Sequence, residues 1–105
     1  MQPSSKVLSE LVDRIVAVTQ PIRILLFGSG ARGEMKPDSD LDVLIVVPEG
    51  QNTNSIARLI YRNLIGFDLP VDLVVTTESD LNRYGQNVSL VYRSALRDGR
   101  QIYAA

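Results

Sequence analysis

A glycine-rich segment and two acidic residues lie close together in FGSGARGEMKPDSDLD, residues 27–42 of this chain. The segment separates two apolar runs, residues 22–27 and residues 41–47, each of which has a proline next to its outer end. Apolar runs of this length predict two buried strands joined by a short connection. We therefore expect a tight glycine turn at residues 28–33, directly after the first strand.

Asp40 and Asp42 lie one residue apart where the second predicted strand begins. Side chains of a strand alternate between its two faces, so both carboxylates point the same way, and Leu44 and Val46 continue that face. Neighbouring carboxylates repel each other and raise one pKa unless a cation neutralises them. The pair therefore predicts a divalent-metal site, and ligand sets made of oxygen atoms favour Mg²⁺ or Mn²⁺.

The composition limits the kinds of chemistry that this chain can perform. It has 105 residues, 45% of them apolar, which predicts one domain over residues 1–105 with a modest core. Cysteine and histidine are both absent, which excludes disulfides, thiolate or imidazole metal ligands, and serine–histidine–aspartate triads. Any catalysis must therefore use carboxylates, hydroxyl groups and basic side chains.

The charge and the N-terminal sequence bear on partners and location. Eleven basic and twelve acidic residues give a net charge of −1, which gives no support for binding to nucleic acid or to an anionic membrane. The sequence shows no signal-peptide pattern and no apolar run of membrane-spanning length. We therefore expect a cytoplasmic protein with no membrane contact.

Periodicity and capping residues predict the other elements. The expected helices cover residues 5–18, 54–65 and 88–98 and a short segment ending near residue 84, and further strands are expected at residues 71–75 and 101–103. Because only a short loop joins the first two strands, the sheet should be mixed rather than wholly parallel. The predicted fold class is α/β (α+β), with helices packed against a small mixed β-sheet.

Two side-chain placements follow from these elements. In the helix over residues 54–65, the inward positions are expected to be Ile56, Leu59, Ile60 and Leu64. In the strand over residues 71–75, alternation places Asp72 on the face that it shares with Val74.

The glycines formally match two other phosphate-binding patterns. Gly28, Gly30 and Gly33 have the spacing of the dinucleotide-binding fingerprint, but Pro37 follows too soon to allow the crossover helix that this motif requires. The spacing from Gly28 to Gly33 also begins a P-loop, but Glu34 and the residue after it stand where lysine and serine or threonine are required. Both interpretations are rejected.

A third pattern fits. Gly28-Ser29, followed after ten residues by Asp40-x-Asp42, with Arg32 and Ser39 between, resembles the signature of the polymerase-β-like nucleotidyltransferase superfamily, and specifically its minimal nucleotidyltransferases. The resemblance extends over nearly the full length of the chain.

The resemblance implies roles for individual residues. Gly28 and Ser29 would contact the triphosphate of a nucleotide, and Arg32 and Ser39 are further candidates for nucleotide binding. Asp40, Asp42 and Asp72 would be the catalytic carboxylates and the metal ligands, with two Mg²⁺ ions expected and Mn²⁺ as an alternative.

The resemblance also implies an activity and a partner. A nucleotidyl group, with AMP from ATP as the main candidate, would pass to an acceptor such as a tyrosine of a HEPN-domain toxin, in a homo- or hetero-oligomer. The main alternative is a non-catalytic antitoxin that masks its partner by forming a complex. Modification of a small molecule is less favoured, because we see no second domain to bind one.

Basic and aromatic residues elsewhere have simpler interpretations. The tyrosines, among them Tyr61, are expected to be packing residues, and Arg58 and Arg62 to form a solvated helix face. Lys36 is near enough in sequence to the glycines to neutralise phosphate charge, but basic loop residues are more often merely solvated.

Overall fold

The computed structural model describes residues 3–36, 39–85 and 99–105. Its elements in chain order are α1 (Ser5–Val16), β1 (Arg23–Phe27), α2 (Gly28–Arg32), β2 (Leu41–Val47), α3 (Thr53–Asn63), β3 (Val71–Thr77), α4 (Glu78–Gly85) and β4 (Arg100–Ala104). The helix expected over residues 88–98 lies outside the described residues. None of the helices in the described part of the chain is both long and apolar enough to cross a lipid bilayer.

The four strands form one mixed sheet in the order β3-β2-β1-β4. β1 pairs with β2 and with β4 in antiparallel orientation, whereas β2 and β3 are parallel. The short connection between β1 and β2 allows only an antiparallel pair, and α3 provides the crossover that a parallel pair needs. The expected mixed sheet is therefore confirmed.

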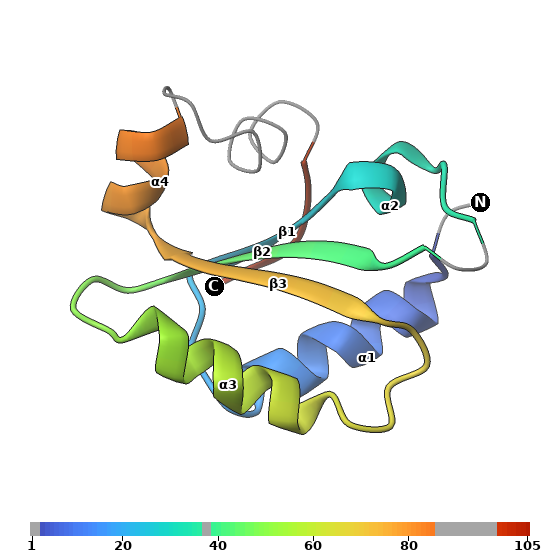
Figure 1. Ribbon diagram of the computed structural model, residues 1–105, viewed down its shortest axis with the longest axis horizontal. Coiled ribbons are helices and arrows are strands. Elements are labelled where there is room, and N and C mark those ends of the chain that lie inside the picture. Colours follow the sequence, from blue (N-terminus) through green and yellow to red (C-terminus); the bar gives the residue numbers. More distant parts are fainter. Residues whose placement is uncertain (1–2, 37–38, 86–98) are drawn as a thin grey trace.

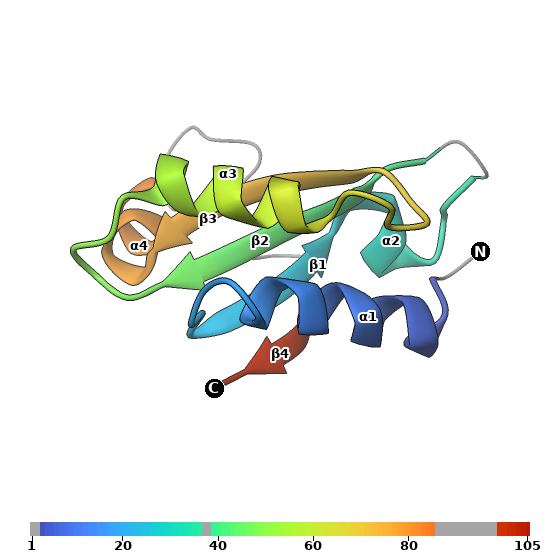
Figure 2. The same ribbon diagram turned by 90° about the horizontal axis from the view of Figure 1, so that it is seen from below.

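Helices cover the two faces of the sheet unequally. α1 and α3 pack on one face, and α2 and α4 stand on the other (Figure 1). Figure 2, seen from the side of α1 and α3, shows both helices lying along the sheet. The larger core lies under these two helices and includes Leu11, Ile15, Leu41, Val43, Ile45 and Ile60. A smaller cluster lies on the opposite face and contains Leu25, Phe27, Leu44, Val46 and Leu81. The alternation predicted for β2 is thus confirmed.

Local signals in the sequence fix the starts of the two long helices. The Ser4 hydroxyl accepts a hydrogen bond from the backbone N–H of Val7 (3.2 Å), and the side chain of Asn52 accepts one from Ser55 (3.0 Å). Each bond satisfies one of the backbone donors that a helix N-terminus leaves free.

Three expectations about local structure are wrong. The segment expected to be a glycine turn forms the short helix α2, which ends at Gly33 with a φ of 72°. Leu59 is 44% exposed rather than inward, because it lies about a quarter turn away from the buried row of α3. Tyr61 is also 44% exposed, and its hydroxyl accepts a hydrogen bond from the backbone N–H of Leu73 on the edge strand β3 (2.9 Å).

Candidate active site

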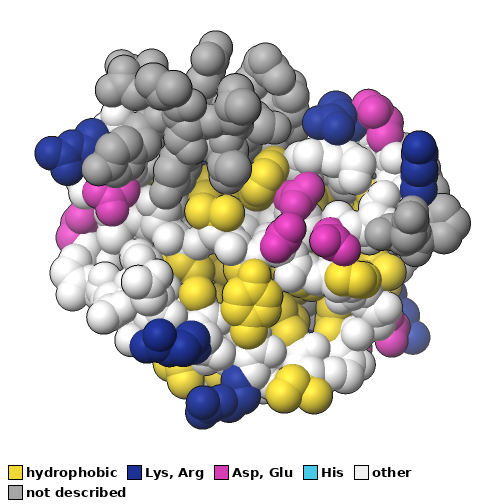
Figure 3. Space-filling view, viewed as in Figure 1, with side chains coloured by type: hydrophobic (Ala, Val, Ile, Leu, Met, Phe, Trp, Pro, Cys, Tyr) yellow, Lys and Arg dark blue, Asp and Glu magenta, His cyan; other side chains and the backbone are white. Residues whose placement is uncertain are grey.

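Asp42 and Asp72 lie next to each other on neighbouring strands. Asp42 is the second residue of β2, Asp72 is the second residue of β3, and the two are direct partners in the parallel register. Directly paired residues point to the same side of a sheet. Both carboxylates therefore belong to the face that carries α2 and α4. Acidic side chains gather near the middle of this view in Figure 3, beside hydrophobic ones.

Gly28 brings the start of α2 against this pair. It follows β1 directly, and β1 pairs with β2 so that Phe27 faces Asp42. A Cβ added at Gly28 would collide with Oδ2 of Asp42. The backbone can approach the carboxylate this closely only because residue 28 has no side chain.

The charge of Asp42 is poorly compensated. Burial raises the pKa of its carboxyl, the negative charges of Asp72 and Asp40 raise it further, and Arg32 opposes them. A carboxyl whose pKa is raised in the folded state destabilises the fold once the pH is high enough to ionise it. A bound cation would relieve this cost, so the chemistry of these donors fits a divalent metal ion.

Asp40 is less closely integrated into the site. It is exposed and lies just before β2, although its charge reaches Asp42. Within residues 3–36, 39–85 and 99–105, no three acidic side chains lie close enough together to form a ready-made metal site. The assignment of three metal ligands stays a prediction.

The other predicted nucleotide-binding residues have different surroundings. Ser29 is the second residue of α2 and is half-buried. Nε of Arg32 pairs with Oε1 of Glu34 at 3.1 Å, but both side chains are well exposed, and such pairs hold a side chain only weakly. Ser39 closes the loop before Asp40, because its hydroxyl accepts a hydrogen bond from the backbone N–H of Lys36 at 2.9 Å. Nucleotide binding by these residues also stays a prediction.

Glu49 has a role in positioning that the sequence did not reveal. Its Oε2 accepts a hydrogen bond from the backbone N–H of Ser79 (3.0 Å), and its Oε1 accepts one from the Ser79 hydroxyl (2.7 Å). These bonds to Ser79 lower the pKa of Glu49. Glu49 thereby fixes the start of α4, whose Leu81 packs on the same face as the carboxylates. An ion pair between Arg23 of β1 and Glu78 (3.1 Å) makes a second link to α4.

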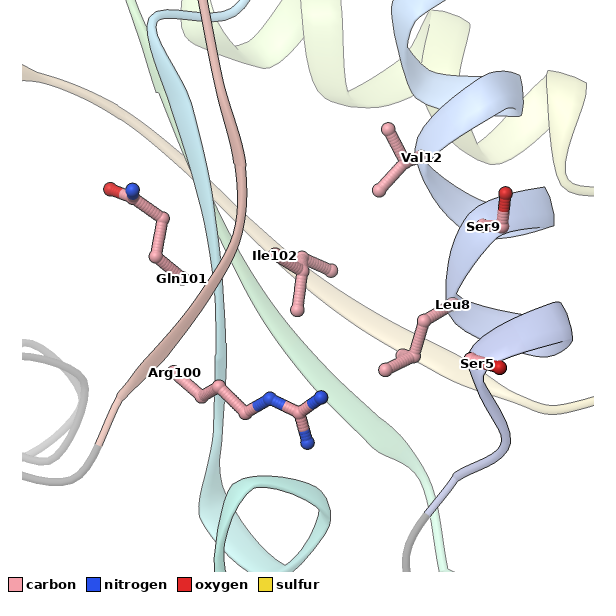
Figure 4. A pocket seen from close by; sticks show the side chains of 7 residues that line it. All are labelled: Ser5, Leu8, Ser9, Val12, Arg100, Gln101 and Ile102. Atoms are coloured by element: carbon pink, nitrogen blue, oxygen red, sulfur yellow. The ribbon is translucent and has the colours of Figure 1, made fainter.

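Two cavities lie away from the carboxylates. One, of about 380 Å³, lies between α1 and β4, where Leu8 and Val12 face Ile102 and the guanidinium of Arg100 points toward the same space (Figure 4). The other, of about 410 Å³, lies at the far end of α1, beside Val16 and Ala105. Both are on the side of the sheet that α1 covers, so neither belongs to the acidic site.

A family model described as "Nucleotidyltransferase domain" matches residues 5–103. The chain belongs to this nucleotidyltransferase family. Over 81 residues it is 32% identical to a Methanocaldococcus jannaschii protein named "Putative protein adenylyltransferase MJ0604", and the match covers 77% of each chain. The family that the sequence resembled is thus confirmed.

Solved structures share the fold. A toxin–antitoxin structure with AMP-PNP has a TM-score of 0.67 at 20% identity, and the match covers 93% of this nucleotidyltransferase and 73% of that chain. The toxin–antitoxin MntA-HepT has a TM-score of 0.63 at 17% identity, covering 97% of this chain and 74% of the other. The predicted nucleotidyltransferase fold is confirmed.

Proposed function

We propose that this nucleotidyltransferase moves AMP from ATP to a hydroxyl group of a partner protein, and that it depends on Mg²⁺. The observation that carries the proposal is the pairing of Asp42 with Asp72, with Gly28 packed against the carboxylate of Asp42. The relative named as a protein adenylyltransferase supports a protein acceptor, and the neighbour solved with AMP-PNP supports an adenine nucleotide as donor.

In the proposed reaction, the acceptor oxygen forms a bond to the α-phosphorus of ATP. The bond between that phosphorus and the oxygen that bridges to the β-phosphate breaks, and pyrophosphate leaves with the electron pair. Asp72 is exposed, so an acceptor can reach it, and we assign it the proton of the attacking hydroxyl. The remaining work of the protein is positioning and charge compensation.

Asp40, Asp42 and Asp72 are the residues that would hold Mg²⁺, with two ions expected and Mn²⁺ as an alternative. Bound divalent ions supply positive charge to the phosphate oxygens and favour ionisation of the attacking hydroxyl. The raised pKa of Asp42 supports this assignment, because burial and the negative charges of Asp72 and Asp40 outweigh the opposing charge of Arg32. Gly28 and Ser29 would contact the triphosphate, with Arg32 and Ser39 as further candidates.

The proposal extends to the partner and to the extent of the domain. We assign residues 1–105 to one nucleotidyltransferase domain, acting in the cytoplasm. The toxin–antitoxin neighbours support a toxin as partner, and we propose a HEPN-domain protein whose tyrosine accepts AMP. The chain would then act as the antitoxin, in a hetero-oligomer with the protein that it modifies.

Transfer of radiolabel tests the proposed activity. The chain is incubated with ATP labelled at the α-phosphate, with Mg²⁺ and with the purified product of the neighbouring gene. We expect label on the partner, and we expect Asp42→Asn to reduce transfer at least about a hundredfold, as loss of a charge-stabilising group in an active site commonly does. Asp13→Asn is the matched control, because Asp13 is an exposed residue of α1 on the other side of the sheet.

The alternative function, masking without catalysis, predicts the opposite result. A masking protein would bind the partner without transferring label from any nucleoside triphosphate, and Asp42→Asn would change nothing. Transfer that is lost in Asp42→Asn, while the complex still forms, would exclude masking as the sole function.

A further inference from the structure

Most of the large hydrophobic residues that are exposed in the described part of the chain lie in α3 or directly after it. Four large hydrophobic residues in residues 3–36, 39–85 and 99–105 are exposed, and three of them belong to α3 or to the turn that ends it. They are Leu59 (44% exposed), Tyr61 (44%) and Ile65 (78%). Single exposed apolar residues are common on protein surfaces, but neighbouring ones often mark a binding surface.

Two arginines complete this surface. Arg58 and Arg62 are exposed, and they lie one helical turn apart on α3, shortly before Ile65 in the chain. Neither forms an ion pair with any carboxylate that the structure describes, and α3 itself contains no acidic residue. Leu59 lies two residues before Tyr61 and therefore on the opposite flank of α3. We call the surface made of Arg58, Tyr61, Arg62 and Ile65 the α3 face.

The α3 face adjoins the candidate active site. The hydroxyl of Tyr61 accepts a hydrogen bond from the backbone N–H of Leu73, the residue after Asp72. α3 runs back along the sheet and leads through a short loop into β3, so its C-terminal end, with Ile65, lies at the same end of the sheet as Asp72. Figure 3 shows basic and hydrophobic side chains below the acidic ones in the same view.

These observations point to the kind of molecule that would cover the α3 face. Tyrosine and arginine are the residues that contribute most often to binding energy in protein interfaces. Ile65 offers aliphatic surface, which suits protein side chains rather than the phosphates of a nucleic acid. The two uncompensated arginines favour carboxylates on the partner.

We infer that the α3 face docks an acidic and apolar segment of the protein that accepts the nucleotidyl group. The inference rests on the proposed function for its acceptor, and it adds the surface that holds this acceptor beside Asp72. A segment docked on the α3 face could pass over the edge of β3 and bring its hydroxyl to the exposed carboxylate of Asp72 on the other face of the sheet.

A binding experiment without ATP and Mg²⁺ tests the docking surface separately from catalysis. The probe is a fluorescent random copolymer of glutamate and tyrosine, which supplies carboxylates, aromatic rings and phenol hydroxyls, and binding is followed by fluorescence anisotropy. We expect Arg58→Glu/Arg62→Glu to weaken binding at least about tenfold, because each substitution replaces attraction with repulsion. The matched control is Lys6→Glu/Arg100→Glu, which makes the same charge change at exposed positions of α1 and β4 and should bind as the wild type does.

A second substitution tests the apolar part of the α3 face. Ile65→Ser removes most of an exposed side chain without changing charge, and it should weaken binding while leaving the thermal midpoint unchanged. Three results would each overturn the inference. The two double variants could bind the copolymer equally well, the wild type could fail to bind it, or the wild type could bind single-stranded RNA in preference to it.

The transfer assay separates this inference from the proposed function. Specific copolymer binding without label transfer to any acceptor would leave the docking surface in place and reject the enzyme. Label transfer to the neighbouring gene product that is equally fast in the wild type and in Arg58→Glu/Arg62→Glu would reject the docking surface and keep the enzyme.

Discussion

Gly28 meets two constraints that other residues at this position would violate. Its φ is 68°, in the left-handed region, and an added Cβ would collide with Oδ2 of Asp42. Gly50 shares the first constraint, with a φ of 83°, but a Cβ there would meet no described atom within 4 Å. We predict that Gly50→Ala costs about 1–2 kcal/mol of unfolding free energy from backbone strain, and that Gly28→Ala costs more. Chemical denaturation of both variants measures the difference.

The same pair of variants also tests the proximity of Gly28 to Asp42. If Gly28→Ala and Gly50→Ala lose equal free energy, the backbone at residue 28 is not pressed against the carboxylate. The glycine spacing predicted a tight turn at residues 28–33, where the structure instead has the short helix α2, and the alternation of β2 predicted the direction of Asp42. Neither pattern could predict that these two residues touch, because that contact depends on the register between β1 and β2.

At the scale of elements, the orientation of α4 depends on a contact between residues thirty positions apart, Glu49 and Ser79. We predict that Glu49→Gln speeds hydrogen exchange of the first backbone amides of α4, because the ionised carboxylate is the stronger acceptor. Exchange in α1 should not change. Glu34→Gln is the matched control, since Glu34 is an exposed glutamate that does not contact α4.

The pH dependence of this contact follows from the lowered pKa of Glu49. A carboxyl whose pKa is lowered by folding stabilises the folded state above its ordinary value of 4.5, and this stabilisation is lost as the pH falls through the lowered folded value. The difference in exchange between wild type and Glu49→Gln should therefore be present at neutral pH and disappear in acid. A difference that persists in acid would show that charge on Glu49 does not hold α4.

Elements with strong local signals were predicted well, and those that depend on distant contacts were not. The strands β1 and β2 and the caps of α1 and α3 follow from short apolar runs and single polar residues. The outward positions of Leu59 and Tyr61 do not follow from such signals. An apolar residue in a helix is predicted to be buried unless its position around the helix axis is compared with that of the buried row.

At the scale of the whole molecule, the mixed sheet brings together residues from three separate parts of the chain. A short β1–β2 connection and the α3 crossover were enough to predict an antiparallel pair beside a parallel one. That topology places residues 42 and 72 on adjacent strands, and residue 28 directly after the end of β1. Strand alternation, which is local, predicted the direction of Asp42, and the family resemblance added Asp72 to the site. Asp40 was expected to be as much a part of the site as Asp42, but it lies exposed ahead of β2.

A ligand that contacts all three parts of the chain should stabilise the whole fold, because it binds only the folded state. At 100 times its dissociation constant, such a ligand adds about 2.7 kcal/mol to the free energy of unfolding. We predict that ATP and Mg²⁺ together raise the thermal midpoint far more than either does alone, because the metal offsets the charge repulsion between the triphosphate and the acidic pair. Asp72→Asn should remove this combined effect and Asp13→Asn should retain it. A full rise with ATP alone, or in Asp72→Asn, would show that nucleotide binding does not use the acidic pair.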